Sequence, residues 1–295
     1  MKKLTGSLLI SFLLLAGLIT AAAAQEKSEK MMGPPRVLLI YREFLKPGKM
    51  GSSHEKTESL FVQAYARAKW PTHYFAADSL SGNPRSMFFV GYDSFAAYEK
   101  DFLATQKNPT LAAALDHAGV VDGELMTERS DAGTFVFNEQ YSMRASVDIA
   151  HMRYFDIEAF HVKPGHHHEW DEAVKLVKAA YEKIPDVHWA MFEHVYGGET
   201  GTYIVFTPMQ SLAEVDTSFA QGKQFQENMG AEGLKKLREL EHAALASAAS
   251  HQLFQFNPRM SYPPDAWVVA DPDFWKPKLA GPPAAKKSDK EPAKH

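Results

Sequence analysis

Residues 41–48 read YREFLKPG, and residues 157–165 read IEAFHVKPG. The two Lys-Pro-Gly triplets lie 117 positions apart, and a short apolar segment precedes each of them. A segment with helical spacing of apolar residues follows each triplet, where Pro-Gly ends the preceding strand. The sequence therefore contains an internal duplication, which restricts the possible folds more than any single motif does.

The elements predicted around the two triplets occur in the same order in both copies. In the first copy they are strands at 36–44, 73–80, 87–92 and 134–138, and helices at 52–70, 94–105 and 109–126. In the second copy they are strands at 153–162, 187–196, 202–206 and 253–257, and helices at 169–184, 212–221 and 231–248. Each copy thus follows the β-α-β-β-α-β order of a ferredoxin-like unit, whose helices cover one face of its sheet.

The predicted strands at 87–92 and 202–206 are apolar at successive positions. Such strands are buried on both faces, so something other than the helices must cover the second face of each sheet. The other copy supplies that cover. We therefore predict an α+β fold of two tandem ferredoxin-like repeats packed sheet to sheet, a pseudo-dimer within one chain with its helices outside.

This arrangement resembles the dimeric α+β barrel superfamily, which includes antibiotic-biosynthesis-monooxygenase-like and NIPSNAP-like domains. The resemblance covers about residues 36–257 and depends on the element order, the strand-Lys-Pro-Gly-helix opening and the duplication. It implies a barrel cleft that binds a small molecule, with a cofactor-independent monooxygenase-like enzyme as one expectation. Because one fold hosts many functions, a non-catalytic binding or assembly module is the alternative.

The first 24 residues have the pattern of a secretory signal peptide. Lys2-Lys3 forms a positive start, residues 8–19 are apolar, and three alanines precede Gln25. We predict that the mature chain begins near Gln25, that a linker occupies 25–35, and that the protein is periplasmic or secreted. No later apolar run approaches the roughly 20 residues of a membrane span, so no membrane contact is expected after cleavage.

The remaining boundaries follow the repeat and the composition. The first repeat is predicted at 36–140, a linker at 141–151, the second repeat at 152–258, a segment rich in proline and aromatic residues at 259–278, and a tail at 279–295. The aromatic segment is expected to pack on the body, because that many exposed aromatic side chains would be a liability. The tail is rich in Pro, Ala and Lys and is predicted to be disordered.

Charge and cysteine content exclude several classes of function. Without Lys2 and Lys3 the chain has 30 basic and 36 acidic residues, a formal charge of −6, so nucleic acid is not an expected partner. The absence of cysteine excludes disulfides, a thiol nucleophile and thiolate metal sites. The expected partner is a small molecule, and the expected assembly is a monomeric pseudo-dimer or a homodimer.

Side-chain alternation along the strands predicts which residues face the space between the two sheets. In the strand that contains Asp156 and Glu158, the more apolar set is assigned to the helices, which points these two carboxylates inward. Shifting this register by 117 positions points Tyr41 and Glu43 inward in the first copy. Asp156, Glu158 and His194 occur in one copy only, so they are the predicted catalytic residues. Two adjacent carboxylates raise the pKa of one of them, which suits a proton donor or acceptor.

The same alternation assigns His188, His194 and Tyr196 to the interior, and His73 matches His188 when the turns that follow are aligned. The predicted ligand-binding residues are Tyr41, Glu43, His73, His188 and Tyr196. Side chains of these types supply acid–base groups or metal ligands. The competing interpretation is that they only satisfy one another or bind water inside the barrel.

Motifs for metals and cofactors are weak in this sequence. His166-His167-His168 resembles a metal-binding tract, but a solvated helix start is the simpler explanation. No His-Glu-x-x-His, Gly-x-Ser-x-Gly or phosphate-loop pattern occurs. We therefore predict no metal ligand set and no cofactor, while a divalent metal or haem stays open. His242 and His251 are the histidines available as axial haem ligands.

Overall fold

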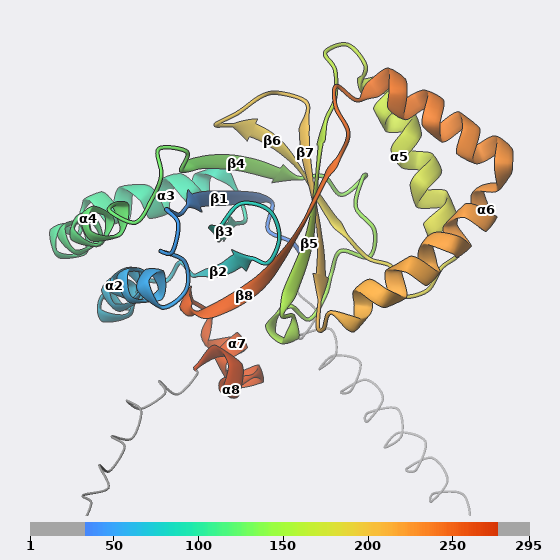
Figure 1. Ribbon diagram of the computed structural model, residues 1–295. Helices are drawn as coiled ribbons and strands as arrows, with labels where there is room; N and C mark the ends of the chain where they lie inside the picture. The colour runs from blue at the N-terminus through green and yellow to red at the C-terminus, as the bar shows by residue number, and fades with distance from the viewer. Residues whose placement is uncertain (1–32, 277–295) are drawn as a thin grey trace, which may run out of the picture.

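A computed structural model describes residues 33–276, which form a closed antiparallel β-barrel flanked by helices (Figure 1). The strands are β1 (Val37–Phe44), β2 (Tyr74–Ser79), β3 (Arg85–Tyr92), β4 (Asp131–Phe137), β5 (Tyr154–His161), β6 (Ala190–Tyr196), β7 (Thr202–Met209) and β8 (Ser250–Tyr262). Around the barrel their order is β1-β3-β2-β8-β5-β7-β6-β4, and β4 pairs with β1 to close the ring.

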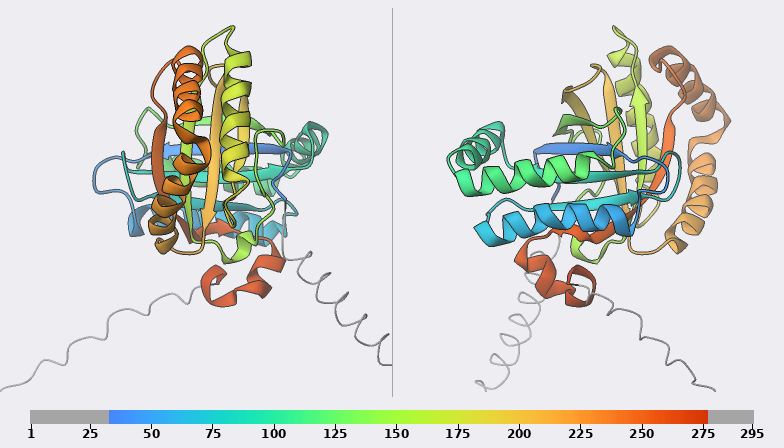
Figure 2. Two further views of the ribbon diagram at one scale, coloured as in Figure 1. Left: turned by 90° about the vertical axis from the view of Figure 1, so that its right-hand side faces the viewer. Right: turned by 60° about the vertical axis from the view of Figure 1, so that its left-hand side comes forward.

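Each half of the barrel is a ferredoxin-like unit. The first half contains β4-β1-β3-β2 and the second half contains β8-β5-β7-β6. The helices are α2 (Ser52–Ala68), α3 (Phe95–Gln106) and α4 (Pro109–Gly123) in the first half, and α5 (His167–Tyr181) and α6 (Ala213–Ala244) in the second. Figure 2 shows α2 beside α4 outside the first-half strands and α5 beside α6 outside the second-half strands. The predicted α+β fold of two tandem repeats with outer helices is confirmed.

The two halves are joined along both pairs of edge strands. β2 pairs with β8, and β4 pairs with β6, each in antiparallel register. β8 has 13 residues, against five in the predicted strand, because its first part pairs with β5 and its second part with β2. The two helices predicted at 212–221 and 231–248 form one kinked helix, α6, in which Gly230 has a φ of 63°. Glycine adopts this left-handed conformation without a Cβ clash.

The barrel interior holds the principal hydrophobic core. Its buried side chains include Leu38, Ile40, Met87, Phe89, Phe135, Phe155, Ile157, Phe192, Phe206, Phe254 and Phe256. An eight-stranded barrel encloses a space that side chains can fill completely, so the interior positions take the most apolar residues. Burial of these side chains contributes roughly 25 cal/mol per Å² of apolar area.

This core reverses the predicted side-chain directions on β5. Phe155 and Ile157 belong to the interior, so the alternating residues Asp156 and Glu158 face outward. The prediction that the two carboxylates point into the space between the sheets is therefore wrong. The more apolar set lines the barrel because the interior is dry, whereas the outer face is only partly covered by helices.

The same correction applies to β1. Leu38 and Ile40 lie in the interior, so Tyr41 and Glu43, assigned to the interior by the 117-position shift, lie on or near the outer, helix-bearing face. The shift itself is sound. The direction chosen for the reference strand is what was wrong, and the shift carried the error to the first copy.

The C-terminal segment closes one end of the barrel. It forms α7 (Asp265–Ala270) and α8 (Pro272–Trp275), which lie below β8 in Figure 1. Trp275 is buried among the interior side chains, and its indole Nε1 donates a hydrogen bond of 2.8 Å to the carbonyl oxygen of Ala150. Trp267 and Phe274 pack against the same core. The aromatic residues of this segment thus form a plug: they pack against the interior core and close this end of the barrel.

Substitution of Trp275 by alanine is expected to lower the free energy of unfolding by about 3–5 kcal/mol, because the barrel end loses a buried aromatic side chain and keeps a cavity. Val269 lies on the same segment and is 81% exposed, so Val269→Ala serves as the matched control with little expected change. Chemical denaturation of both variants checks the difference. Equal effects in the two variants would contradict the plug.

Among the helices of residues 33–276, none combines the length and the apolarity that a bilayer crossing needs. The predicted signal peptide, most of the predicted linker at 25–35 and the predicted tail lie outside the described residues.

Candidate functional site

Of the three residues predicted to be catalytic, the fold keeps Asp156 and Glu158 together and places His194 elsewhere. Asp156 and Glu158 lie on the outer face beside His251 of β8, whose ring nitrogens are 4.0 Å and 3.6 Å from their carboxylate oxygens. The His251 side chain is 60% exposed and Asp156 is 40% exposed, so solvent reaches this group. Partial burial raises the pKa of Asp156 and of Glu158, and the nearby His251 acts in the opposite direction.

The predicted second-copy residues on and before β6 have separate environments. His194 is buried, and its ring stacks on Phe135 with 4.3 Å between ring centroids; burial lowers its pKa. Both ring nitrogens of His188 lie within hydrogen-bond distance of backbone carbonyl oxygens, those of Asp186 and Pro208. Tyr196 is 66% exposed. His188 therefore links two backbone carbonyl groups, and Tyr196 faces solvent.

The three first-copy residues of the predicted set do meet, at a cavity outside the barrel. Tyr41, Glu43 and His73 line a cavity of about 490 Å³ between the first-half sheet and the helices α2, α3 and α4. Aromatic rings dominate its wall: Phe61, Tyr65, Trp70, Tyr74, Phe88, Tyr92, Tyr98 and Phe102. Tyr41 and Phe102 are also exposed, so the cavity opens to solvent beside them. Its size is that of a small-molecule site.

Asp101 of α3 fixes one side of this cavity. Its carboxylate accepts hydrogen bonds from Trp70 Nε1 at 2.9 Å, Thr72 Oγ1 at 2.6 Å and the Tyr92 hydroxyl at 2.8 Å. These contacts join α3 to the loop before β2 and to β3. Because the three donors satisfy the carboxylate, Asp101 acts as a fixed anchor for the aromatic wall.

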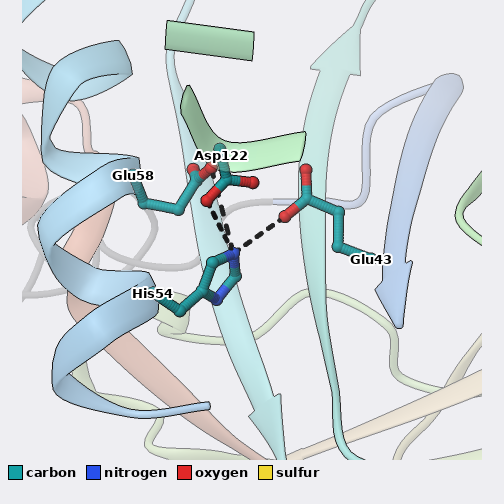
Figure 3. A group of neighbouring side chains, drawn as sticks. All are labelled: Glu43, His54, Glu58 and Asp122. Atoms are coloured by element: carbon teal, nitrogen blue, oxygen red, sulfur yellow. Dashed lines mark hydrogen bonds and ion pairs between the residues drawn. The ribbon is translucent and has the colours of Figure 1, made fainter. Parts of the chain in front are cut away.

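Glu43 and Glu58 form the polar end of the cavity, together with His54 and Asp122 behind them. Figure 3 shows the four side chains converging from β1, α2 and α4. His54 Nε2 lies 3.0 Å from Glu43 Oε2, 3.5 Å from Asp122 Oδ1 and 4.0 Å from Glu58 Oε1. The side chains of His54, Glu58 and Asp122 are 1%, 4% and 0% exposed. Three carboxylates therefore share one histidine in a dry place.

Burial and mutual repulsion perturb the titration of this cluster. Burial raises the pKa of Glu43, and burial together with the charges of Glu43 and Asp122 holds the pKa of Glu58 well above its usual range. Burial alone would lower the pKa of His54, but its carboxylate neighbours outweigh that effect and raise it to about 10. The cluster thus retains protons that the same groups would release in water.

A second layer of hydrogen bonds orients His54. Its Nδ1 lies 3.2 Å from the Ser86 hydroxyl oxygen, and that hydroxyl donates to Asp78. Asp78 in turn accepts a hydrogen bond of 2.7 Å from Asn257 of β8. Since the single Ser86 proton goes to Asp78, the Ser86 oxygen is left to accept the Nδ1 proton of His54. The Nε2 atom consequently faces the carboxylates.

The second half shows what the same positions contain where the charges are absent. Phe160 lies 117 positions after Glu43, and Tyr203 lies 117 positions after Ser86. On the helices, Trp170 and Val174 lie 116 positions after His54 and Glu58. All four are apolar or aromatic and pack together, with ring centroids 5.0 Å apart for Phe160 and Trp170 and 5.5 Å apart for Trp170 and Tyr203.

The fold therefore does not require charged side chains at these positions. Buried ion pairs are often less stabilising than apolar packing of similar volume, so a charged cluster that replaces such packing points to a use other than stability. The polar-for-apolar replacement between copies was visible in the sequence. It marks His54 and Glu58, which residue-type motifs and strand alternation did not single out. Asp122 has no comparable sequence signal.

The two histidines considered for haem do not share this environment. His242 of α6 and His251 of β8 are both exposed. His251 faces the carboxylates of Asp156 and Glu158, and His242 lines a surface pocket with Lys163 and Arg238. An axial haem ligand is held against a largely apolar pocket, which neither position provides.

Neither a protein-family model nor a curated protein matches the chain. Solved structures of similar fold include a protein described as a monooxygenase from Fusobacterium nucleatum subsp. nucleatum, with 11% identity, coverage of 76% of this chain and 94% of that chain, and a TM-score of 0.49. An anthrone oxidase-like protein matches with 15% identity, 77% and 94% coverage and a TM-score of 0.49. A chlorite dismutase variant from Candidatus Nitrospira defluvii matches with 11% identity, 77% and 92% coverage and a TM-score of 0.44. The likeness concerns the fold alone.

Proposed function

We propose that the protein binds a small, flat, mostly aromatic molecule in the first-half cavity and acts on it at the end formed by Glu43 and Glu58. The main support for this proposal is the cavity itself, which has a volume of about 490 Å³, an aromatic wall and a carboxylate end. Planar aromatic ligands gain both apolar burial and ring contacts from such a wall. The predicted secretory leader would place this function in the periplasm or outside the cell.

Polar atoms on the cavity wall support a ligand with hydrogen-bonding groups. Within residues 33–276, three buried atoms of the lining residues have no hydrogen-bond partner: Glu58 Oε1, His73 Nδ1 and the Tyr74 hydroxyl. Buried polar atoms are normally satisfied, and an unsatisfied atom in a cavity is a natural contact for a ligand. Phenol or enol oxygens on the bound molecule would meet them.

The carboxylate end supports an enzyme rather than a passive carrier. A ligand lying along the aromatic wall has its polar group beside Glu43 and Glu58, the position from which a proton can be moved. The wall excludes water from most of the ligand, which strengthens electrostatic contacts at that end. Turnover of the ligand is therefore the expected activity, and proton transfer at its acidic group is the expected first step.

Blocking the cavity mouth tests the proposal. Gly119 of α4 lines the cavity, is exposed and has open space where a Cβ would lie, so Gly119→Trp is expected to fold and obstruct entry. Gly222 of α6 has the same open space in the second half, so Gly222→Trp is the matched control. Calorimetric titration with 2-naphthol and 9-phenanthrol, beside native mass spectrometry of co-purified molecules, measures binding.

We expect at least about ten-fold weaker binding in Gly119→Trp, which corresponds to 1.4 kcal/mol, and unchanged binding in Gly222→Trp. Equal binding by all three proteins, or binding by none of them together with no co-purified molecule, would contradict the proposal. A ligand that binds at this cavity and is never converted would retain the binding function and exclude the enzyme.

A further inference from the structure

The four-residue cluster gathers three acidic side chains around a single histidine. Three carboxyl groups converge on one imidazole, whose Nε2 lies between 3.0 and 4.0 Å from one oxygen of each. We propose that Glu43, His54, Glu58 and Asp122 bind one divalent first-row transition-metal ion, with Mn²⁺ and Zn²⁺ as the probes to be used. This proposal does not depend on a ligand in the cavity.

The spacing of the donor atoms fits a single ion. One ligand atom from each of the four residues can be chosen so that all lie within 4.8 Å of one another. Nitrogen and oxygen ligands lie about 2.0–2.2 Å from Zn²⁺, so neighbouring ligands in a tetrahedral site are separated by distances like those seen here. Figure 3 shows that the three carboxylates surround the Nε2 side of His54.

The orientation of His54 is the one that a metal ligand needs. The Ser86 hydroxyl oxygen accepts the Nδ1 proton of His54, so the free lone pair of the neutral imidazole is on Nε2, which faces the carboxylates. Metal-binding histidines almost always have their other ring nitrogen held by a hydrogen-bonding partner in this way. The chain from Ser86 through Asp78 to Asn257 would supply that support.

Unsatisfied oxygens in the cluster are an independent observation. Among the described residues, Glu58 Oε1 and Asp122 Oδ2 are buried and without a hydrogen-bond partner. Their side chains are 4% and 0% exposed. An unpartnered carboxylate oxygen in a dry place is costly, and a cation beside it removes the cost.

The second half supplies the argument that the charges serve a purpose. Phe160, Trp170 and Val174 fill the corresponding positions with apolar packing, so the barrel folds there without any charged group. An ion pair confined to His54 and its neighbours would offer no gain over that packing. An ion that binds to the cluster does offer one, because its binding free energy adds to the stability of the folded state.

The donor set selects the class of metal. Carboxylate oxygens suit Mg²⁺, Ca²⁺ and Mn²⁺, whereas an imidazole nitrogen suits Zn²⁺, Fe²⁺, Cu²⁺ and Ni²⁺. One nitrogen with three carboxylates lies between these groups, which favours Mn²⁺, Fe²⁺ or Zn²⁺ over the alkaline earth ions. Since Glu43 and Glu58 also line the cavity, the ion would lie at its polar end.

Metal titration of chelator-treated full-length protein tests the proposal. Calorimetry with Zn²⁺ and Mn²⁺, and electron paramagnetic resonance with Mn²⁺, give the stoichiometry and Kd. Glu58→Gln and Glu43→Gln remove one ligand each and keep the side-chain shape. Glu158→Gln is the matched control, because Glu158 belongs to the other acidic group with a histidine, Asp156, Glu158 and His251, which lies on the second half and is more accessible to solvent.

We expect one ion per chain. The Kd should rise in Glu58→Gln and Glu43→Gln by at least the roughly 10- to 100-fold that loss of a hydrogen-bonding partner of a metal ligand costs. Glu158→Gln should bind as the unmodified protein does. Circular dichroism confirms folding of each variant, and anomalous diffraction from Zn²⁺-loaded crystals of the unmodified protein locates the ion even if a variant fails to fold.

Absence of binding by both ions, or binding that only Glu158→Gln weakens, would overturn the metal site; His54 would then be the cationic partner of the carboxylates. The Gly119→Trp variant separates this result from the proposed function. If the metal site exists and the ligand site does not, Gly119→Trp and the unmodified protein bind the ion equally and neither binds an aromatic probe.

Discussion

Substitution of His54 by leucine lowers the free energy of unfolding of the metal-free protein by about 3–5 kcal/mol at pH 8, the usual cost of leaving a buried charge without its partner. His54 has a pKa of about 10, so it is cationic at that pH and balances negative charge among the three acidic side chains around it. Leucine keeps most of the volume, which isolates the electrostatic part of the loss. Chemical denaturation in the presence of a chelator measures it.

The deficit of His54→Leu is expected to shrink as the pH is raised from 6 to 10. The carboxyl groups around His54 raise its pKa from the ordinary 6.5 to about 10, so its positive charge stabilises the folded state fully below pH 6.5 and less at each higher pH. Near pH 10 His54 has lost much of its proton in the unmodified protein, so its replacement by leucine removes less electrostatic stabilisation. A deficit that is the same at pH 6 and pH 10 would show that lost packing, not charge, is responsible.

A combined replacement is the control for this prediction. Its changes copy the second half, with a leucine for the remaining acid: Glu43→Phe, His54→Trp, Glu58→Val, Ser86→Tyr and Asp122→Leu. Removing the whole buried charge cluster should recover the stability of the metal-free parent or exceed it by up to about 4 kcal/mol. A combined variant less stable than His54→Leu would contradict the equivalence of the two halves.

The isolated first half, residues 36–141, is expected to self-associate into a dimer rather than fold as a monomer. In the intact chain, β2 pairs with β8 and β4 pairs with β6, so the isolated half has two open edges. It also exposes the barrel-facing side chains of its strands, including Ile40, Phe89 and Phe135. Exposure of apolar area to water costs roughly 25 cal/mol per Å², so association that buries these side chains is favoured.

Light scattering after gel filtration and the dispersion of amide resonances measure the outcome for the half-chain. A second copy can replace the missing half, because both halves have the same element order. The chain from residue 33 to residue 276 serves as the comparison and should be monomeric under the same conditions. A soluble, well-dispersed monomer of residues 36–141 would show that the halves are independent domains.

The sequence by itself determined the architecture. The Lys-Pro-Gly repeat, the order of the elements and the strands that are apolar at successive positions were sufficient to predict two ferredoxin-like units with helices outside. These signals are local or periodic, so they survive without knowledge of the tertiary contacts. Strand parity was also readable: Asp156 and Glu158 do share a face, as do Phe155 and Ile157.

Only the tertiary structure decided which face is which and where the candidate site lies. Alternation separates two sets of side chains but does not say which set is inside, and the closed barrel gives the driest positions to the most apolar set. The cluster brings together Glu43 of β1, His54 of α2 and Asp122 of α4. Asp122 is distant in sequence from the other two residues. A site made by packing separate elements against each other has no local signature, because its residues become neighbours only when the helices close over the sheet.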